Sequence, residues 1–209
     1  MAKLAVLIPS YNEIHNLKKI IKKNYNFLII DDCSSDGTNL LLKKKKIKFI
    51  RNNKNLGYEK SLIKGMKYVI NNKFHTLCTL DADFEHPIDK IDSLYKFFRK
   101  EDLDILVCNR RSQNRFLEKV LSFFFYKKHK IKDPMSGMKF YKTSSLKKIL
   151  KDASNKYFLV ELVLQGIENK FKIKNKEIKT KKNLVNSKIG FGIKTQIKII
   201  NIFKLFLFS

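Results

Sequence analysis

Three carboxylates stand at alternate positions after a short apolar run, and their spacing is the clearest indication of chemistry in this chain. Asp81, Asp83 and Glu85 follow residues 76–80 and precede Pro87. Because successive side chains of a strand point to opposite faces, we expect the three acids to converge and to repel one another unless a cation lies between them. Oxygen ligands of this kind suit Mg²⁺ or Mn²⁺ holding a diphosphate. The alternative is an acidic loop that caps the helix after Pro87.

The elements that must position these acids follow from the hydrophobic pattern. Short apolar runs alternate with segments of helical period at 13–23, 58–71 and 88–100, which predicts a Rossmann-like α/β fold with a buried, mostly parallel sheet flanked by helices. The expected strands are Leu4–Ile8, Phe27–Ile30, Phe49–Ile50, Thr76–Leu80 and Ile105–Cys108. Binding sites in such sheets lie at the carboxyl ends of strands. Polar clusters stand at four of these ends, in residues 9–13, 31–38, 81–85 and 109–111.

Length and cysteine content limit the class of protein. With 209 residues, 44% of them hydrophobic, the chain is expected to form a single domain over 1–209. Its three cysteines are odd in number and lack metal-ligand spacing, so neither a disulfide framework nor a zinc site is expected, and a reducing cytoplasm fits.

A formal net charge of +26 predicts attraction to polyanions, which include nucleic acid, diphosphate substrates and anionic membrane surfaces. Lysine that occurs with abundant Asn and Ile is also what an A/T-rich genome produces. A basic nucleic-acid-binding protein is therefore one alternative. The sequence shows neither an RNA-recognition motif nor a helix-turn-helix pattern, and such a protein has no need for three acids at a sheet edge.

The second half of the chain carries two apolar segments beside basic residues. Residues 116–125 are rich in Phe and Leu and lead into a basic run at 127–130, which suits either a buried helix or a membrane interface. In the tail, apolar residues recur at helical spacing over 193–207 with lysines on the opposite side, which predicts an amphipathic C-terminal helix that lies in a membrane surface. We therefore expect a cytoplasmic protein that binds the cytoplasmic face of a membrane peripherally.

Further motifs, taken with the acid cluster, resemble a known family. The matching pieces are Ile8-Pro9-Ser10-Tyr11-Asn12-Glu13, Ile30-Asp31-Asp32-Cys33-Ser34-Ser35-Asp36-Gly37-Thr38, Asn55-Leu56-Gly57, Asp81-Ala82-Asp83-Phe84-Glu85-His86-Pro87, Asn109-Arg110, Asp133-Pro134-Met135-Ser136-Gly137-Met138, Glu177-Ile178 and Asn186-Ser187-Lys188. In this order they resemble inverting family 2 glycosyltransferases of GT-A fold, in the branch of dolichol-phosphate mannosyltransferases and bacterial polyprenyl-phosphate sugar transferases. The resemblance implies a nucleotide-sugar-binding half at 1–111, and an acceptor and membrane-interface half at 112–209.

The resemblance also implies roles for single residues. Asp81, Asp83 and Glu85 would bind Mg²⁺ or Mn²⁺ with the donor diphosphate, and Glu85 stands where this branch commonly has Gln. Arg110 matches the arginine of a Gly-Ser-Arg motif and would donate two hydrogen bonds to phosphate. Lys182 replaces an arginine of the family and keeps only its charge. The implied nucleotide-sugar-binding residues are Pro9, Tyr11, Glu13, Ile30, Asp31, Asp32, Asp81, Ala82, Lys182 and Lys188.

The implied reaction moves a sugar from a nucleotide diphosphate sugar to a polyprenyl phosphate, with Asp83, Arg110 and Asp133 as the catalytic residues. A phosphate acceptor is already ionised, whereas a sugar hydroxyl in polysaccharide or lipooligosaccharide synthesis would need a general base. For that second acceptor class, Asp133 or Glu161 is the candidate base. Asp133 alternatively caps the turn before Ser136.

Overall fold

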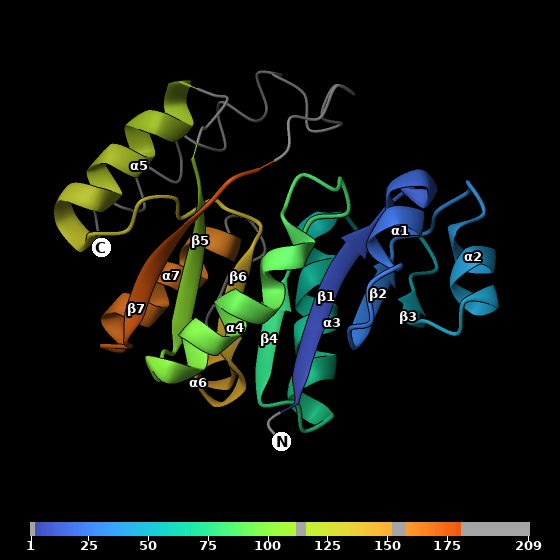
Figure 1. The fold of residues 1–209 in the computed structure, drawn as a ribbon, viewed down its shortest axis with the longest axis horizontal. Helices are drawn as coiled ribbons and strands as arrows, with labels where there is room; N and C mark the ends of the chain where they lie inside the picture. The colour runs from blue at the N-terminus through green and yellow to red at the C-terminus, as the bar shows by residue number, and fades with distance from the viewer. Residues whose placement is uncertain (1–2, 112–115, 152–157, 181–209) are drawn as a thin grey trace.

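The computed structural model describes residues 3–111, 116–151 and 158–180, which form one seven-stranded sheet with helices on both faces (Figure 1). The strand order is β3-β2-β1-β4-β6-β5-β7, and every pairing is parallel except those of β6, which is antiparallel to both β4 and β5. The strands are β1 (Leu4–Ser10), β2 (Phe27–Asp31), β3 (Lys48–Arg51), β4 (Thr76–Thr79), β5 (Ile105–Arg110), β6 (Lys139–Lys142) and β7 (Ile173–Ile178). The predicted mostly parallel α/β sheet is confirmed.

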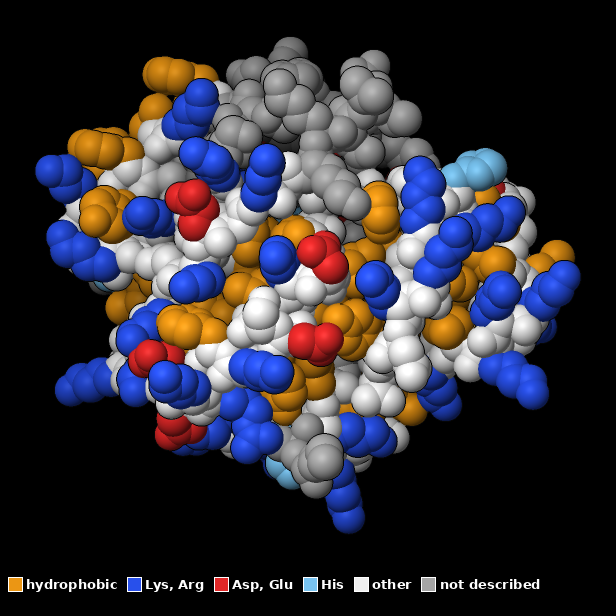
Figure 2. Space-filling view, viewed as in Figure 1, with side chains coloured by type: hydrophobic (Ala, Val, Ile, Leu, Met, Phe, Trp, Pro, Cys, Tyr) orange, Lys and Arg blue, Asp and Glu red, His pale blue; other side chains and the backbone are white. Residues whose placement is uncertain are grey.

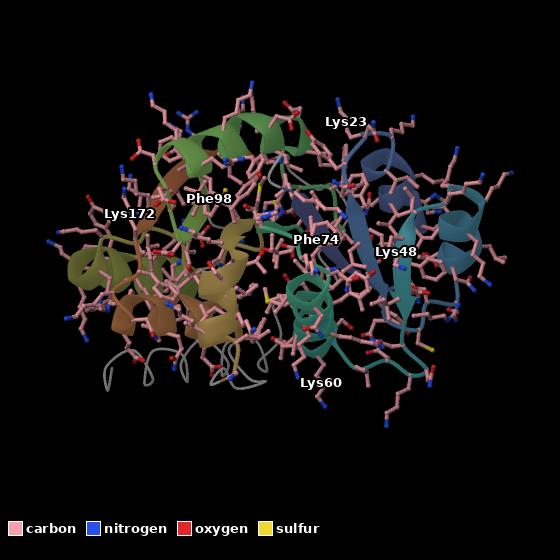
Figure 3. The ribbon with its side chains drawn as sticks, turned by 90° about the horizontal axis from the view of Figure 1, so that it is seen from below. Lys23, Lys48, Lys60, Phe74, Phe98 and Lys172 are labelled. Atoms are coloured by element: carbon pink, nitrogen blue, oxygen red, sulfur yellow. The ribbon has the colours of Figure 1, made fainter. Side chains whose placement is uncertain are left out.

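A layer of helices covers each face of the sheet, and the strands contribute side chains to a separate hydrophobic core on each face. The helices are α1 (Ile14–Ile20), α2 (Thr38–Lys44), α3 (Tyr58–Asn71), α4 (Ile91–Lys100) with the 3₁₀ turn η1 (Ile88–Lys90) before it, α5 (Phe116–His129), α6 (Thr143–Ile149) and α7 (Phe158–Glu168). In β1, Val6 and Ile8 pack with α1, α2 and α4, whereas Ala5 and Leu7 pack with α3, α6 and α7. Figure 3 shows this division, with Phe98 of α4 and Lys60 of α3 on opposite sides of the sheet.

Helix α3 has the bounds that the sequence predicts, and its first turn lies at the edge of the sheet where the polar clusters meet. Leu62, Met66 and Val69 recur every three or four residues and are buried, so one stripe of the helix faces the core. Gly65 allows close packing, because a Cβ there would lie 2.2 Å from Leu7 Cδ1. The helix thus packs tightly against β1 and β2, which fixes the position of its N-terminal residue Tyr58.

Five elements were not predicted from the sequence: α2, β6, α6, α7 and β7. Of these, β6 matters most for the site, because it lies between β4 and β5 and leads the 133–139 segment to the edge where the acids lie.

Helix α5 contains the aromatic segment 116–125, for which the sequence suits either a buried helix or a membrane interface. Leu121 and Phe125 are buried in the core on the α7 side of the sheet, while Phe116, Phe123 and Phe124 are exposed. The helix is therefore buried along one stripe and aromatic on its open side. The predicted amphipathic helix at 193–207, together with Lys182 and Lys188, lies outside the described residues. No helix in the described ranges is long and apolar enough to cross a membrane.

Candidate active site

The acids after β4 lie in a turn rather than on a strand, so the predicted alternation is wrong. Strand β4 ends at Thr79, and residues 82 and 83 form a turn in which Phe84 has a φ of 64°. Asp83 Oδ1 accepts a hydrogen bond from the Glu85 backbone N–H at 3.0 Å, a local bond that favours a turn over an extended strand. Within the described residues, no three Asp, Glu, His or Cys side chains are grouped as metal ligands, so the predicted three-acid set is not assembled.

Asp81 is held by residues from two other elements. Tyr58 Oη donates a hydrogen bond to Asp81 Oδ1 at 2.7 Å, from the first turn of α3. The other carboxylate oxygen, Oδ2, lies 3.8 Å from His86 Nδ1 and against Gly137, where an added Cβ would be 1.9 Å away. These contacts fix the carboxylate of Asp81 in one orientation.

Asp83 has a raised pKa, as expected for a buried carboxylate with other acids nearby. Burial, and after it the negative charges of Asp81, Glu85 and Glu13, raise the pKa of Asp83 to about 7, although its bond with the Glu85 N–H acts in the opposite direction. Excess negative charge with oxygen donors is the environment that a hard divalent cation neutralises. Asp81 and Asp83 therefore fit Mg²⁺ or Mn²⁺, whose remaining positions substrate oxygens can fill.

Arg110, at the end of β5, is bound to acidic side chains. Its Nε and Nη2 donate to the two carboxylate oxygens of Asp133 at 2.9 and 3.1 Å, and Nη2 also donates to Glu118 Oε2 at 3.2 Å. Burial lowers the pKa of Arg110, but the hydrogen bonds and charges of Asp133 and Glu118 outweigh this effect and raise it. The two-bonded fork that was predicted for phosphate is formed here with Asp133. The phosphate contact of Arg110 stays a prediction.

Asp133 is only 1% exposed, and it also accepts a hydrogen bond from the Arg110 backbone N–H at 3.1 Å. A carboxylate that accepts three hydrogen bonds from a cationic residue is poorly arranged to take a proton from an acceptor. The base role of Asp133 stays a prediction that this geometry does not favour.

The two adjacent aspartates after β2 have different partners. Asp32 accepts hydrogen bonds from Asn52 Nδ2 and from the backbone N–H groups of Leu56 and Gly57, all within 2.8 Å, so it holds the loop that leads into α3. Asp31 is fully buried, and its Oδ2 accepts no hydrogen bond from the described residues, although Arg51 Nη1 lies 3.6 Å away.

Ser10 is the register partner of Asp31 on β1, and its buried Oγ also has no hydrogen-bond partner among the described residues. Two neighbouring buried polar groups without partners at a strand end are what a polar ligand would satisfy.

A family model described as glycosyl transferase family 2 matches residues 5–150 of this chain. The chain belongs to glycosyl transferase family 2. A dolichol-phosphate mannosyltransferase from Pyrococcus furiosus is 30% identical in an alignment of 164 positions that covers 65% of this chain and 45% of that protein. An uncharacterized protein, MJ0544 from Methanocaldococcus jannaschii, is 30% identical in an alignment of 133 positions that covers 58% of this chain and 58% of that protein. This chain thus spans about half the length of these two relatives.

Solved structures show the same fold. Glucosyl-3-phosphoglycerate synthase from Mycobacterium tuberculosis, solved with Mn²⁺ and UDP-glucose, superposes with a TM-score of 0.73 at 12% identity, over 97% of this chain and 77% of that one. This likeness establishes the GT-A fold of the glycosyltransferase.

The remaining predicted donor residues lie at the ends of β1 and β2 or beside the acid turn. Pro9 and Ile30 are register partners, and the exposed Tyr11 follows the end of β1. Glu13 lies near enough for its charge to raise the pKa of Asp83, so the fold brings the first polar cluster (9–13) and the third (81–85) together. Ala82 is buried between the two acids.

A cavity of about 530 Å³ opens beside Arg110, between α5 and the ends of β5 and β7. It is lined by Asn109, Arg110, Arg111, Lys119, Ser122, Phe123, Tyr126, Lys132 and Glu177. Figure 2 shows Lys and Arg side chains over most of the visible face of the glycosyltransferase, with hydrophobic side chains protruding among them over α5. This cavity combines basic and aromatic walls next to the acid site.

Four residues around Asp81 and Arg110 were not among the predicted site residues: Tyr58, Glu118, Gly137 and Lys139, which lies within reach of the charges of Asp81 and Asp133. A tyrosine at the start of a predicted helix and a lysine in an undetected strand carry no local signal of a site. His86 is 4% exposed, both its ring nitrogens lack a hydrogen-bond partner in the described part of the chain, and burial lowers its pKa, so it is an uncharged neighbour of Asp81.

Proposed function

We propose that this family 2 glycosyltransferase moves one sugar, with inversion, from a nucleotide diphosphate sugar to a polyprenyl phosphate, with Mg²⁺ or Mn²⁺ bound by Asp81 and Asp83. The observation that carries the proposal is the position of the two acids just after the carboxyl end of β4, where Tyr58 and Gly137 hold the Asp81 carboxylate in place. The charge of Asp81 also contributes to the raised pKa of Asp83. A bound divalent ion would stabilise the charge that develops on the leaving diphosphate. Glu85 belongs to the proposed set as a ligand that reorientation of the turn would bring in.

The donor side of the proposal rests on buried polar groups at the end of the sheet. Asp31 Oδ2 and Ser10 Oγ are buried without hydrogen-bond partners among the described residues, and they suit a base N–H and a polar group of the nucleotide. Tyr11, with 45% of its surface exposed, would stack on the base. Asp32 would act indirectly, by holding the loop before α3. Lys182 and Lys188 would bind the diphosphate.

The acceptor side rests on the cavity beside α5. Arg111, Lys119 and Lys132 place positive charge there, and Phe123 and Tyr126 add apolar surface, a combination that suits a phosphate attached to a hydrocarbon chain. Asp133 is bound by Arg110 and is not placed as a base, which favours an acceptor that is already ionised. In this proposal, residues 1–111 serve the donor and 112–209 the acceptor.

The second candidate is transfer to a sugar hydroxyl in polysaccharide or lipooligosaccharide synthesis. The observation that favours it is the fold itself, because the glucosyl-3-phosphoglycerate synthase that shares it was also solved with UDP-glucose and phosphoglyceric acid, a molecule that carries a hydroxyl group. In this case Asp133 would have to leave Arg110, or Glu161 would have to serve as base. An assay of polyprenyl phosphate against oligosaccharide acceptors separates the two candidates.

The donor is tested by thermal shift with GDP-, UDP- and dTDP-sugars, each with and without Mn²⁺. A ligand that binds only the folded state stabilises it by about 2.7 kcal/mol at a hundred times its dissociation constant. We expect one base to raise the melting temperature, and more strongly with Mn²⁺. A panel in which no nucleotide sugar shifts the melting temperature would contradict the donor proposal.

Membrane contact is the second part of the proposal. A prenyl chain stays in the bilayer, so the site must reach the membrane surface, and the exposed aromatic residues of α5 beside lysines suit that contact. We expect the chain to bind liposomes that contain anionic lipid, and to bind less as salt rises. Absence of binding to anionic liposomes at low salt would favour a saccharide acceptor.

A further inference from the structure

Lys139 is a fully buried lysine at the centre of the sheet. It begins β6, where its Cα pairs with those of Thr79 in β4 and Val107 in β5, and none of its surface is exposed. Removing an ammonium group from water is unfavourable unless hydrogen bonds and opposite charges compensate. A position that served only to pack the sheet would favour an apolar side chain, so packing alone does not explain the lysine.

The Lys139 ammonium holds the turn that precedes its own strand. Its Nζ donates a hydrogen bond to the carbonyl oxygen of Ser136. Two further bonds tie this turn to its neighbours: Thr79 Oγ1 donates to the Gly137 carbonyl at 2.8 Å, and Ser136 Oγ donates to the Cys108 carbonyl at 2.7 Å. The turn at 136–138 is therefore anchored to β4, to β5 and, through Lys139, to β6.

This turn forms the wall against which Asp81 lies. A Cβ on Gly137 would stand 1.9 Å from Asp81 Oδ2 and 2.4 Å from its Cγ, so the glycine backbone and the carboxylate are in direct contact. A displacement of the turn would therefore either push Asp81 aside or open a gap beside it. The orientation of Asp81 thus depends on where the turn is held.

Lys139 lies among charged residues on both sides of the site, namely Asp81 and the Asp133–Arg110 pair. Burial, opposed by the charges of Asp133 and Asp81 and assisted by that of Arg110, lowers the pKa of Lys139 to about 8. The lysine therefore lies within electrostatic reach of the Asp133–Arg110 pair and of Asp81.

We propose that Lys139 is a positioning residue for the donor site, which holds the Ser136–Gly137 turn and through it the Asp81 carboxylate in the orientation that binds a divalent cation with the donor diphosphate. The inference rests on the proposed function, since it assigns Asp81 to the cation. It adds a residue that touches neither the cation nor the donor. A substitution of Lys139 in β6 should therefore weaken cation binding, although the lysine itself is not a ligand.

The test uses Lys139→Met and Lys139→Gln in the full chain, with Lys142→Met as the matched control. Lys142 lies in the same strand, but it is partly exposed and pairs with Asp102 at 3.0 Å. Mn²⁺ affinity is measured by electron paramagnetic resonance titration without donor, the donor KM and kcat by turnover of the nucleotide sugar, and folding by circular dichroism and melting temperature. Wild-type protein is titrated alongside the variants, which tests the proposed function separately. If wild type binds no Mn²⁺, the proposed cation site itself is contradicted, whatever the Lys139 variants do.

We expect a folded Lys139 variant to bind Mn²⁺ at least fivefold more weakly than wild type, with a raised donor KM, while Lys142→Met stays within twofold. The sign is informative, because loss of a nearby positive charge alone would strengthen cation binding. Unchanged or tighter Mn²⁺ binding in a folded variant would overturn the proposal. If neither variant folds, Lys139 serves the stability of the sheet, and the positioning role is likewise wrong.

Discussion

The hydroxyl of Tyr58 donates a hydrogen bond to Asp81 Oδ1 across 2.7 Å, so the first residue of α3 orients the first acid after β4. The two residues are 23 positions apart, and burial together with the charge of Asp81 raises the pKa of Tyr58 well above its usual value. Tyr58 therefore stays protonated and remains a hydrogen-bond donor at neutral pH.

Tyr58→Phe is expected to lower kcat/KM for the donor by about tenfold or more, because a hydrogen bond to a charged group contributes about 1.5–3 kcal/mol. Steady-state turnover of the nucleotide sugar with Mn²⁺ measures it. Tyr68→Phe on the same helix makes the same substitution away from the acids and should leave kcat/KM unchanged. Equal kcat/KM values for the two variants would show that Tyr58 does not contribute to the site.

Asp83→Ala is expected to reduce sugar transfer at least about a hundredfold, the size of effect seen when one key electrostatic group is lost, while circular dichroism shows a folded protein. EDTA should produce a similar loss in wild type. Asp89→Ala, at an exposed acid in η1, is the control and should retain full activity. Turnover that survives both EDTA and Asp83→Ala would contradict the role of Asp83 in holding the cation.

The raised pKa of Asp83 predicts a pH dependence of stability. Because the folded protein holds the Asp83 proton more tightly than the unfolded chain, this group stabilises the fold below pH 4, and that contribution is lost as pH rises to about 7. We expect the urea midpoint of metal-free wild type to fall from pH 4 to pH 7 relative to that of Asp83→Asn, which cannot titrate there. Parallel curves for the two proteins would show that Asp83 titrates at an ordinary pKa.

Arg110→Ala should destabilise the fold by about 3–5 kcal/mol, because it leaves the buried carboxylates of Asp133 and Glu118 without their cation. Urea unfolding measures the change. Arg111→Ala is the control, since the Arg111 side chain is 72% exposed and should contribute less than about 1 kcal/mol. Arg110→Lys keeps the charge but cannot donate two parallel hydrogen bonds, so partial recovery is expected.

The sequence predicts the donor half of the fold well because its signals are local. The apolar runs of β1, β2 and β4 stand alone between polar residues, and α3 was predicted with its observed bounds. By contrast, β6 begins with a lysine, and its remaining residues, Phe140 to Lys142, are too few to form a pattern. Its place between β4 and β5 depends on pairing across 60 residues, which no local pattern contains.

The candidate site shows the same limit. Alternation placed Asp81, Asp83 and Glu85 correctly at the end of β4, but it assumed that the strand continues, whereas the local bond between Asp83 and the Glu85 N–H bends the chain. The partners of Arg110 could not be predicted, because Asp133 and Glu118 reach it from segments that only the folded chain brings together. Residue types identified the chemistry, and tertiary contacts decide how each group is used.

The position of β6 also has a consequence for how the chain assembles. Strands β3, β2, β1 and β4 form a continuous block that is complete once Thr79 has been synthesised, whereas β5 pairs in the described sheet with β6 and β7, which come later in the chain. During translation, β5 must therefore wait without a strand partner until Lys142 has emerged. A fragment ending at Arg111 would carry that bare apolar strand and is expected to aggregate, whereas a split before Ile105 would leave β5 with its neighbours.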